Sequence, residues 1–205
     1  AQNYMYMVPD NYLIGHQAGE ELQRGIWSGK YNTFFGYQAG LNDTIGENNV
    51  FIGYQSGYTN TDGNYNVFLG NLSGFSNTTG SNNVFIGRLA GFSNTTGMSN
   101  TFVGDSSGYS NTTGNYNSFY GYLSGKSNTT GYSNFFGGNQ SGYSNENGIR
   151  NVYIGNNSAY SNEGGSYNVV MGYYSARNAT DLGNSVILGY YSGYNADTTS
   201  NCIMI

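Results

Sequence analysis

Charged residues are scarce in this chain of 205 residues, and three other residue types that often carry chemistry occur only once. Asp, Glu, Lys and Arg together make up 8% of the sequence, and His, Cys and Trp appear once each. A single cysteine excludes an intrachain disulfide framework. The six basic residues are scattered and the net charge is −5, so nucleic acid is not an expected partner.

Long apolar runs are missing as well. No stretch approaches the roughly 20 consecutive apolar residues of a membrane helix, so membrane insertion is not expected. No window sustains an apolar stripe at the helical period, and the 33 glycines recur too often for a helix. No signal-peptide pattern is visible, but Ala1-Gln2 is the kind of N-terminus that signal cleavage leaves. We therefore expect a secreted mature chain.

The sequence contains instead a strict repeat of seventeen residues. Each unit has an apolar triplet such as Val84-Phe85-Ile86 and a glycine at its fifth place. A fixed short period is typical of stacked coils that bury one continuous core. We predict an all-β fold, a parallel β-solenoid (β-roll) of about eleven 17-residue coils. The regular coils start at Asn32, Asn49, Asn66, Asn83, Asn100, Asn117, Asn134, Asn151, Asn168 and Ser185.

The repeat divides the chain into three segments. Residues 1–10 lie outside it and are interpreted as an N-terminal cap or junction, because an open solenoid end exposes unpaired backbone groups. Residues 11–31 form a first coil with a four-residue insertion, and residues 32–205 form the regular solenoid. The last coil breaks off at Ile205, so we expect the natural polypeptide to continue.

Within a coil we predict a short strand, a glycine corner, a second short strand and a polar turn. The fifth place is always Gly, which indicates positive φ or a close backbone approach. The ninth place also accepts Ala159 and Ala176, which indicates a tight contact more than a positive φ. Four Asn-Thr-Thr-Gly segments are formal glycosylation sequons, but we favour their role as turns.

The centre of the apolar triplet is phenylalanine in seven consecutive regular coils. Because neighbours in a strand point to opposite faces, we predict that Val and Ile fill the roll and that Phe points out of it. Seven rings stacked at about 4.8 Å make a stripe about 30 Å long. The exposed area of such a stripe would approach the ~300–600 Å² patch that monomers leave in water. Another copy of the chain is the expected cover. The predicted self-association residues are Phe34, Phe51, Phe68, Phe85, Phe102, Phe119 and Phe136.

Other aromatic residues and the insertion supply candidates for ligand binding. Tyrosines at the sixth place form predicted inter-coil ladders, and exposed tyrosines also suit carbohydrate or protein contact. The insertion carries the only Trp and several charges, and insertions in solenoids become loops that are often functional. The alternative is an end-capping loop in which Trp27 covers the terminal coil. The candidates are Trp27, Glu20, Arg24, Tyr37 and Tyr54.

A resemblance to a known family is carried by residues 183–192, which read Gly183-Asn184-Ser185-Val186-Ile187-Leu188-Gly189-Tyr190-Tyr191-Ser192. This segment resembles the head repeat of trimeric autotransporter adhesins. The other coils resemble a longer variant found in bacterial and phage tail-fibre-like surface proteins. The resemblance covers about residues 11–205 and implies a left-handed β-roll, three chains about one axis, and a role in adhesion or receptor binding.

Catalysis has little support in the sequence. His16 is the only histidine and the acidic residues occupy scattered places, so neither a metal cluster nor a Ser-His-acid set can be assembled. We expect no enzyme and no cofactor. The expected function is an extracellular, self-associating (homotrimeric) solenoid that forms the head or shaft of a surface adhesin or tail fibre, on a cell or virion, and binds a surface glycan or protein. The alternatives are a polymerising extracellular filament or matrix subunit, and ice binding through stacked Thr.

Overall fold

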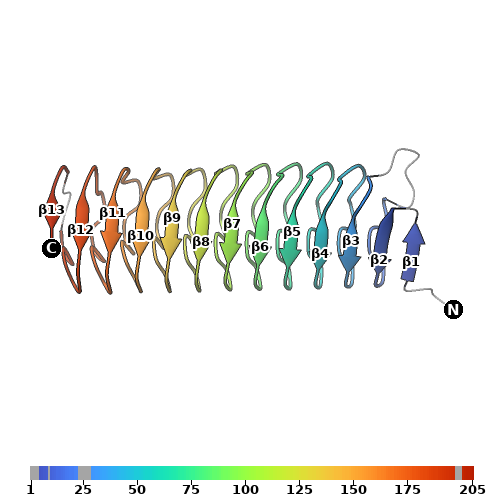
Figure 1. The fold of residues 1–205 in the computed structure, drawn as a ribbon, viewed down its shortest axis with the longest axis horizontal. Coiled ribbons are helices and arrows are strands. Elements are labelled where there is room, and N and C mark those ends of the chain that lie inside the picture. Colours follow the sequence, from blue (N-terminus) through green and yellow to red (C-terminus); the bar gives the residue numbers. More distant parts are fainter. Residues whose placement is uncertain (1–4, 9, 23–28, 197–199) are drawn as a thin grey trace.

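The computed structural model describes residues 5–8, 10–22, 29–196 and 200–205. These residues form thirteen strands and no helix, in one sheet whose strand order follows the chain (Figure 1). Strands β2 to β13 run parallel, and β1 pairs antiparallel with β2. The strands are β1 (Met5–Val8), β2 (Asn11–Ile14), β3 (Thr33–Phe35), β4 (Val50–Ile52), β5 (Val67–Leu69), β6 (Val84–Ile86), β7 (Thr101–Val103), β8 (Ser118–Tyr120), β9 (Phe135–Gly137), β10 (Val152–Ile154), β11 (Val169–Met171), β12 (Val186–Leu188) and β13 (Ile203–Met204).

The strands pair in a constant register, so equal places of successive coils lie side by side. Phe68, for example, is opposite Phe85, which is opposite Phe102, each 17 residues further along the chain. Figure 1 shows the coils stacked along one axis, with β1 and β13 at opposite ends. The predicted all-β parallel solenoid is confirmed.

Each regular coil contains one three-residue strand, and the predicted second strand is absent from the coils that the structure describes. The segment after the glycine corner turns repeatedly because the seventh and ninth places are left-handed, as at Leu89 (φ 58°) and Gly91 (φ 60°). Some of its N–H groups still bond between coils, first back to the preceding coil and then forward to the next. Leu89 donates to the carbonyl of Asn71 in the preceding coil, and Gly91 donates to that of Ser107 in the next.

The two glycine places differ in what they exclude. At the fifth place, Gly87 has a φ of 133° and a Cβ there would lie 2.5 Å from the carbonyl oxygen of Gly104 in the next coil. Positive φ and close backbone approach therefore both apply, as predicted. At the ninth place, a Cβ on Gly91 would lie 2.5 Å from the ring of Phe85. Ala159 has a φ of 48° there, so the expectation that this place does not need a positive φ is wrong.

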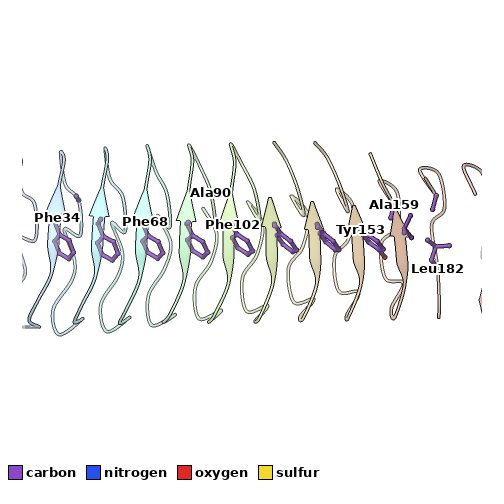
Figure 2. Close-up of a cluster of buried hydrophobic side chains, with 14 of the residues drawn as sticks. Phe34, Phe68, Ala90, Phe102, Tyr153, Ala159 and Leu182 are labelled. Atoms are coloured by element: carbon purple, nitrogen blue, oxygen red, sulfur yellow. The ribbon is translucent and has the colours of Figure 1, made fainter. Parts of the chain in front are cut away.

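The central phenylalanines point into the coil, not out of it. All seven are fully buried within the single chain, and with Tyr153 they form one stack of nearly parallel rings, 4.7–4.9 Å apart (Figure 2). The predicted orientation is wrong because the small residues at the eighth and ninth places leave room inside each coil for one ring. The residues predicted for self-association, Phe34, Phe51, Phe68, Phe85, Phe102, Phe119 and Phe136, are core residues.

Two columns of buried asparagines complete the interior. At the first place, Asn83 accepts the N–H of Asn100 on its Oδ1 and donates from Nδ2 to the carbonyl of Gly97. At the twelfth place, Asn94 Nδ2 donates to Asn77 Oδ1 (2.8 Å) and to Gly97 O (3.0 Å). Buried amides are stable only when their hydrogen-bonding groups are paired. The sequon asparagines therefore hold the turn, as the turn interpretation predicts, and their amide nitrogens are already engaged.

The inward stack predicts unequal effects of two neighbouring truncations. Phe102→Ala removes a fully buried ring and leaves a cavity, so we expect a loss of about 3–5 kcal/mol in the free energy of unfolding. Val103→Ala trims a half-exposed side chain and is expected to cost less than about 1 kcal/mol. Urea unfolding followed by circular dichroism measures both. Equal losses would contradict the inward orientation.

Candidate functional site

The outer surface of the sheet is mainly apolar along the length of the solenoid. The side chains at the second and fourth places of β2 to β12 point away from the core, all are at least partly exposed, and none is charged. We call this surface the outer sheet face. Its second-place residues are Tyr12, Thr33, Val50, Val67, Val84, Thr101, Ser118, Phe135, Val152, Val169 and Val186, and its fourth-place residues are Ile14, Phe35, Ile52, Leu69, Ile86, Val103, Tyr120, Gly137, Ile154, Met171 and Leu188.

Large and small residues compensate each other on the outer sheet face. In β8 the bulky Tyr120 shares its strand with Ser118, and in β9 the bulky Phe135 shares its strand with Gly137. The ring of Phe135 occupies the space beside Gly137, since a Cβ on that glycine would lie 3.5 Å from the ring. It also contacts the ring of Tyr120, 5.9 Å away between centroids. The two side chains together keep the face continuous where glycine would leave a hole.

Tyr37 and Tyr54, two candidates for ligand binding, are brought together at the sixth place. Their rings stack 5.4 Å apart and nearly parallel, and His16 stacks on Tyr37 from the other side. The ladder role predicted for these tyrosines is confirmed. Stacking covers ring faces between coils, and both tyrosines still have more than a third of their surface exposed. A ligand-binding role for the pair stays a prediction.

The remaining candidates belong to the first coil and its insertion. Glu20 is half-buried and directly follows the ninth-place Gly19. Arg24 and Trp27 lie outside the residues that the structure describes, so both interpretations of the insertion, binding loop and end cap, stay open.

The tenth place carries a second ladder in which cations substitute for rings. Lys126 donates from Nζ to the hydroxyl of Tyr143 (2.8 Å), and this hydrogen bond is the main reason why the pKa of Lys126 is raised. Arg177 lies 5.0 Å from the ring centre of Tyr160. Such cation–π contacts continue the column where an aromatic residue is missing. The ring pairs of this ladder are Tyr58–Phe75, Phe75–Phe92, Phe92–Tyr109 and Tyr143–Tyr160.

One member of the twelfth-place column is a carboxyl group. Asp43 is buried, accepts the N–H of Gly46 (2.8 Å) and accepts from Nδ2 of Asn60 (3.0 Å). Burial raises the pKa of Asp43 to about 7, against the effect of these two hydrogen bonds and with a small contribution from Asp62. Sequence reasoning did not single out this residue. The signal was available, since Asp43 stands where the next seven coils have Asn.

The hydrogen-bond ladder of the twelfth-place column is interrupted beside Tyr153, which belongs to the third-place stack. Its hydroxyl accepts from Nδ2 of Asn162 (2.7 Å), so this amide does not bond to the preceding asparagine of the column. The Oδ1 atom of that asparagine, Asn145, is buried without a hydrogen-bond partner. Burial also raises the pKa of Tyr153, which keeps its hydroxyl neutral. One oxygen atom on the third-place stack thus breaks the neighbouring amide ladder.

Residues that could bind a metal ion are scattered over the part of the chain that the structure describes. Among the described residues there is no group of three or more His, Cys, Asp or Glu residues that could hold a metal ion. The described residues also include no helix with the length and apolarity to cross a bilayer. The threonine hydroxyls on which ice binding was considered are partly used within the ladder, because Thr78 and Thr95 donate from Oγ1 to carbonyl groups of the next coil. Ice binding stays an untested alternative.

Comparison with known proteins gave no match for this chain among family models, curated proteins or solved structures. The resemblance to trimeric autotransporter adhesin heads and tail-fibre repeats therefore stays a prediction from the sequence.

The buried carboxyl group predicts a pH-dependent effect of Asp43→Asn. The folded protein prefers the protonated acid, because the pKa rises from 3.8 to about 7. Below pH 4 Asp43 is protonated in both the folded and the unfolded chain, so its burial lowers the stability least. As the pH rises towards 7, the carboxyl group ionises more readily in the unfolded chain, and the free energy of unfolding falls. We expect Asp43→Asn to stabilise the fold at pH 8 by up to about 4 kcal/mol and to have little effect at pH 3.5.

Thermal unfolding across this pH range measures the difference. The matched control is Asn94→Asp, which places a carboxyl group in the middle of the same column and removes two donated hydrogen bonds. It is expected to destabilise the fold, most strongly at pH 8. A gain from Asp43→Asn that does not change with pH would contradict the assignment.

Removing the hydroxyl of Tyr153 is expected to repair the amide ladder. In Tyr153→Phe, Asn162 is free to donate to Asn145 Oδ1, as equivalent asparagines do in the preceding coils. The buried oxygen then gains a partner, so we expect stability to be unchanged or raised by about 1 kcal/mol. Denaturant unfolding measures the effect. A loss above about 1 kcal/mol would show that the hydroxyl stabilises the fold.

Proposed function

We propose that this chain is a rigid structural rod of an extracellular fibre, which forms the head or shaft of a surface adhesin or tail fibre and acts together with copies of itself. The observation that supports the proposal most directly is the unbroken interior. One ring per coil continues from Phe34 to Tyr153 without a gap, and the asparagine column at the first place runs beside it.

A stack of this kind resists bending. Each coil contacts its two neighbours through backbone hydrogen bonds, side-chain amides and rings, and few parts of a coil lack such contacts. Eleven coils at about 4.8 Å give a rod of about 50 Å, whose length grows in direct proportion to the number of coils. Such a unit is suited to hold other segments at a fixed distance from a surface.

The surface supports contact more than chemistry. Outward-facing residues are mainly Tyr, Thr, Ser, Asn and aliphatic side chains, and the charged residues are few. Aromatic edges and hydroxyl groups are suited to a glycan or protein partner. For a head domain, we propose the exposed Tyr37 and Tyr54 and the insertion with Glu20, Arg24 and Trp27 as the contact region.

Small-angle X-ray scattering and binding assays test this proposal. We expect the purified chain to scatter as a straight rod of about 50–60 Å. A labelled chain is then applied to arrays of bacterial and mammalian glycans and to immobilised matrix proteins. We expect Tyr54→Ala and Trp27→Ala to weaken binding at least about 10-fold, and Tyr132→Ala, an exposed tyrosine in the polar turn, to leave it unchanged.

The outcomes separate the parts of the proposal. Scattering from a compact or flexible particle overturns the rod and the function built on it. Binding that survives both substitutions overturns the proposed contact region. A rod that binds no probe overturns the head role and favours the shaft.

A further inference from the structure

We propose that two copies of the chain associate face to face through the outer sheet face, as a two-fold dimer. This inference rests on the proposed function, because it names the surface by which the rods associate. It also replaces the assignment of self-association to the third-place phenylalanines that the sequence suggested, because these residues are buried in the core.

The outer sheet face has the anatomy of a protein interface. Its two columns are largely apolar and carry no charge, as the centres of interfaces do. Tyrosines border it at both ends of the strands. Tyr31, Tyr65 and Tyr116, each about 60% exposed, precede the strands at the seventeenth place, whereas Tyr37, Tyr54 and Tyr122 follow them at the sixth. Tyrosine is enriched at interfaces because its ring packs while its hydroxyl stays hydrated.

The area of the face also favours a dimer. Two columns about 7 Å apart, with their side chains, form a strip about 11 Å wide, and eleven strands make it about 50 Å long. One copy would bury roughly 550 Å² from these columns alone, so a pair buries about 1,100 Å² before the tyrosine border is added. A stable interface needs about 1,000 Å², and a strip of this size is at the upper end of what monomers leave in water.

The partner is identified by periodicity. The face repeats at every coil, about 4.8 Å, over its whole length, and a globular partner does not offer side chains at that spacing over about 50 Å. A second copy of this chain does. Two sheets can pack face to face about 10 Å apart, whereas three faces arranged about one axis meet at angles and contact mainly along their edges. The geometry therefore favours two copies over three.

The compensation between Phe135 and Gly137 points the same way. A hole or a bulge on a surface exposed to water has little effect on the free energy. Under a protein partner, the same hole or bulge would prevent close packing. Phe135 lies over Gly137 and against Tyr120, so the surface stays continuous in β8 and β9, where its residue sizes vary most. A surface of this regularity is suited to a closely packed, dry contact.

Sedimentation equilibrium of the complete chain tests the inference. At concentrations from about 1 to about 100 µM we expect a species of twice the 22.2 kDa chain mass. Ile52→Lys with Ile86→Lys places two charges on the face, and we expect it to raise the dimer dissociation constant at least about 100-fold. The control pair, Thr79→Lys with Thr113→Lys, adds the same charge on the exposed polar turn and is expected to remain dimeric.

A milder pair keeps the test decisive if the lysine pair fails to fold. Ile52→Thr with Ile86→Thr retains β-branched side chains and is expected to weaken the dimer about 10-fold. A monomeric wild type, a trimeric wild type, or unchanged dimerisation of folded face variants overturns the inference. Scattering distinguishes its failure from that of the proposed function, since a wild type that is rod-shaped but monomeric contradicts the dimer alone.

Discussion

Stacking of one aromatic ring per coil is the interaction on which the rest of the structure depends. Parallel strands lie about 4.8 Å apart, and the rings lie 4.7–4.9 Å apart, so a single spacing satisfies both the hydrogen bonds and the core. The rings leave little room opposite them, which explains Gly91 and its equivalents. Amides then fill the remaining interior, because their ladders repeat at the same spacing.

The period, the parallel strands, the fifth-place corner and the asparagine turns could be predicted from the sequence, since each depends on a residue type at a fixed spacing. Which side of the strand is inside could not be predicted from Val84-Phe85-Ile86, because alternation shows only that neighbours face opposite ways. A signal did exist. The second place tolerates Thr101 and Ser118, whereas the third place is apolar or Tyr throughout. Reading tolerance along each column would have placed Phe inside.

The error about which side of the strand faces inward also misplaced the candidate surface. The sequence argument correctly required both faces of the strand to be apolar, but it assigned the exposed stripe to the wrong column. In the structure, the exposed stripe belongs to the second and fourth places and is wider than the predicted one. The titrating carboxyl group of Asp43 was missed for another reason. Its pKa depends on burial, which a single acidic residue in a turn does not reveal.

Large side chains stand beside small ones both in the core and on the outer sheet face. The reason for this balance differs between the two places, and the difference is relevant to self-association. Inside, the ring is lost at Val170, and the same coil has buried Leu182 where the preceding regular coils have the turn glycine. Inside a closed coil this balance is needed, because the atoms around a void lose van der Waals contacts. Outside, Phe135 balances Gly137 although no part of the described chain covers that face. Water does not enforce such a balance, so this pair of residues supports the proposed contact between two copies of the chain.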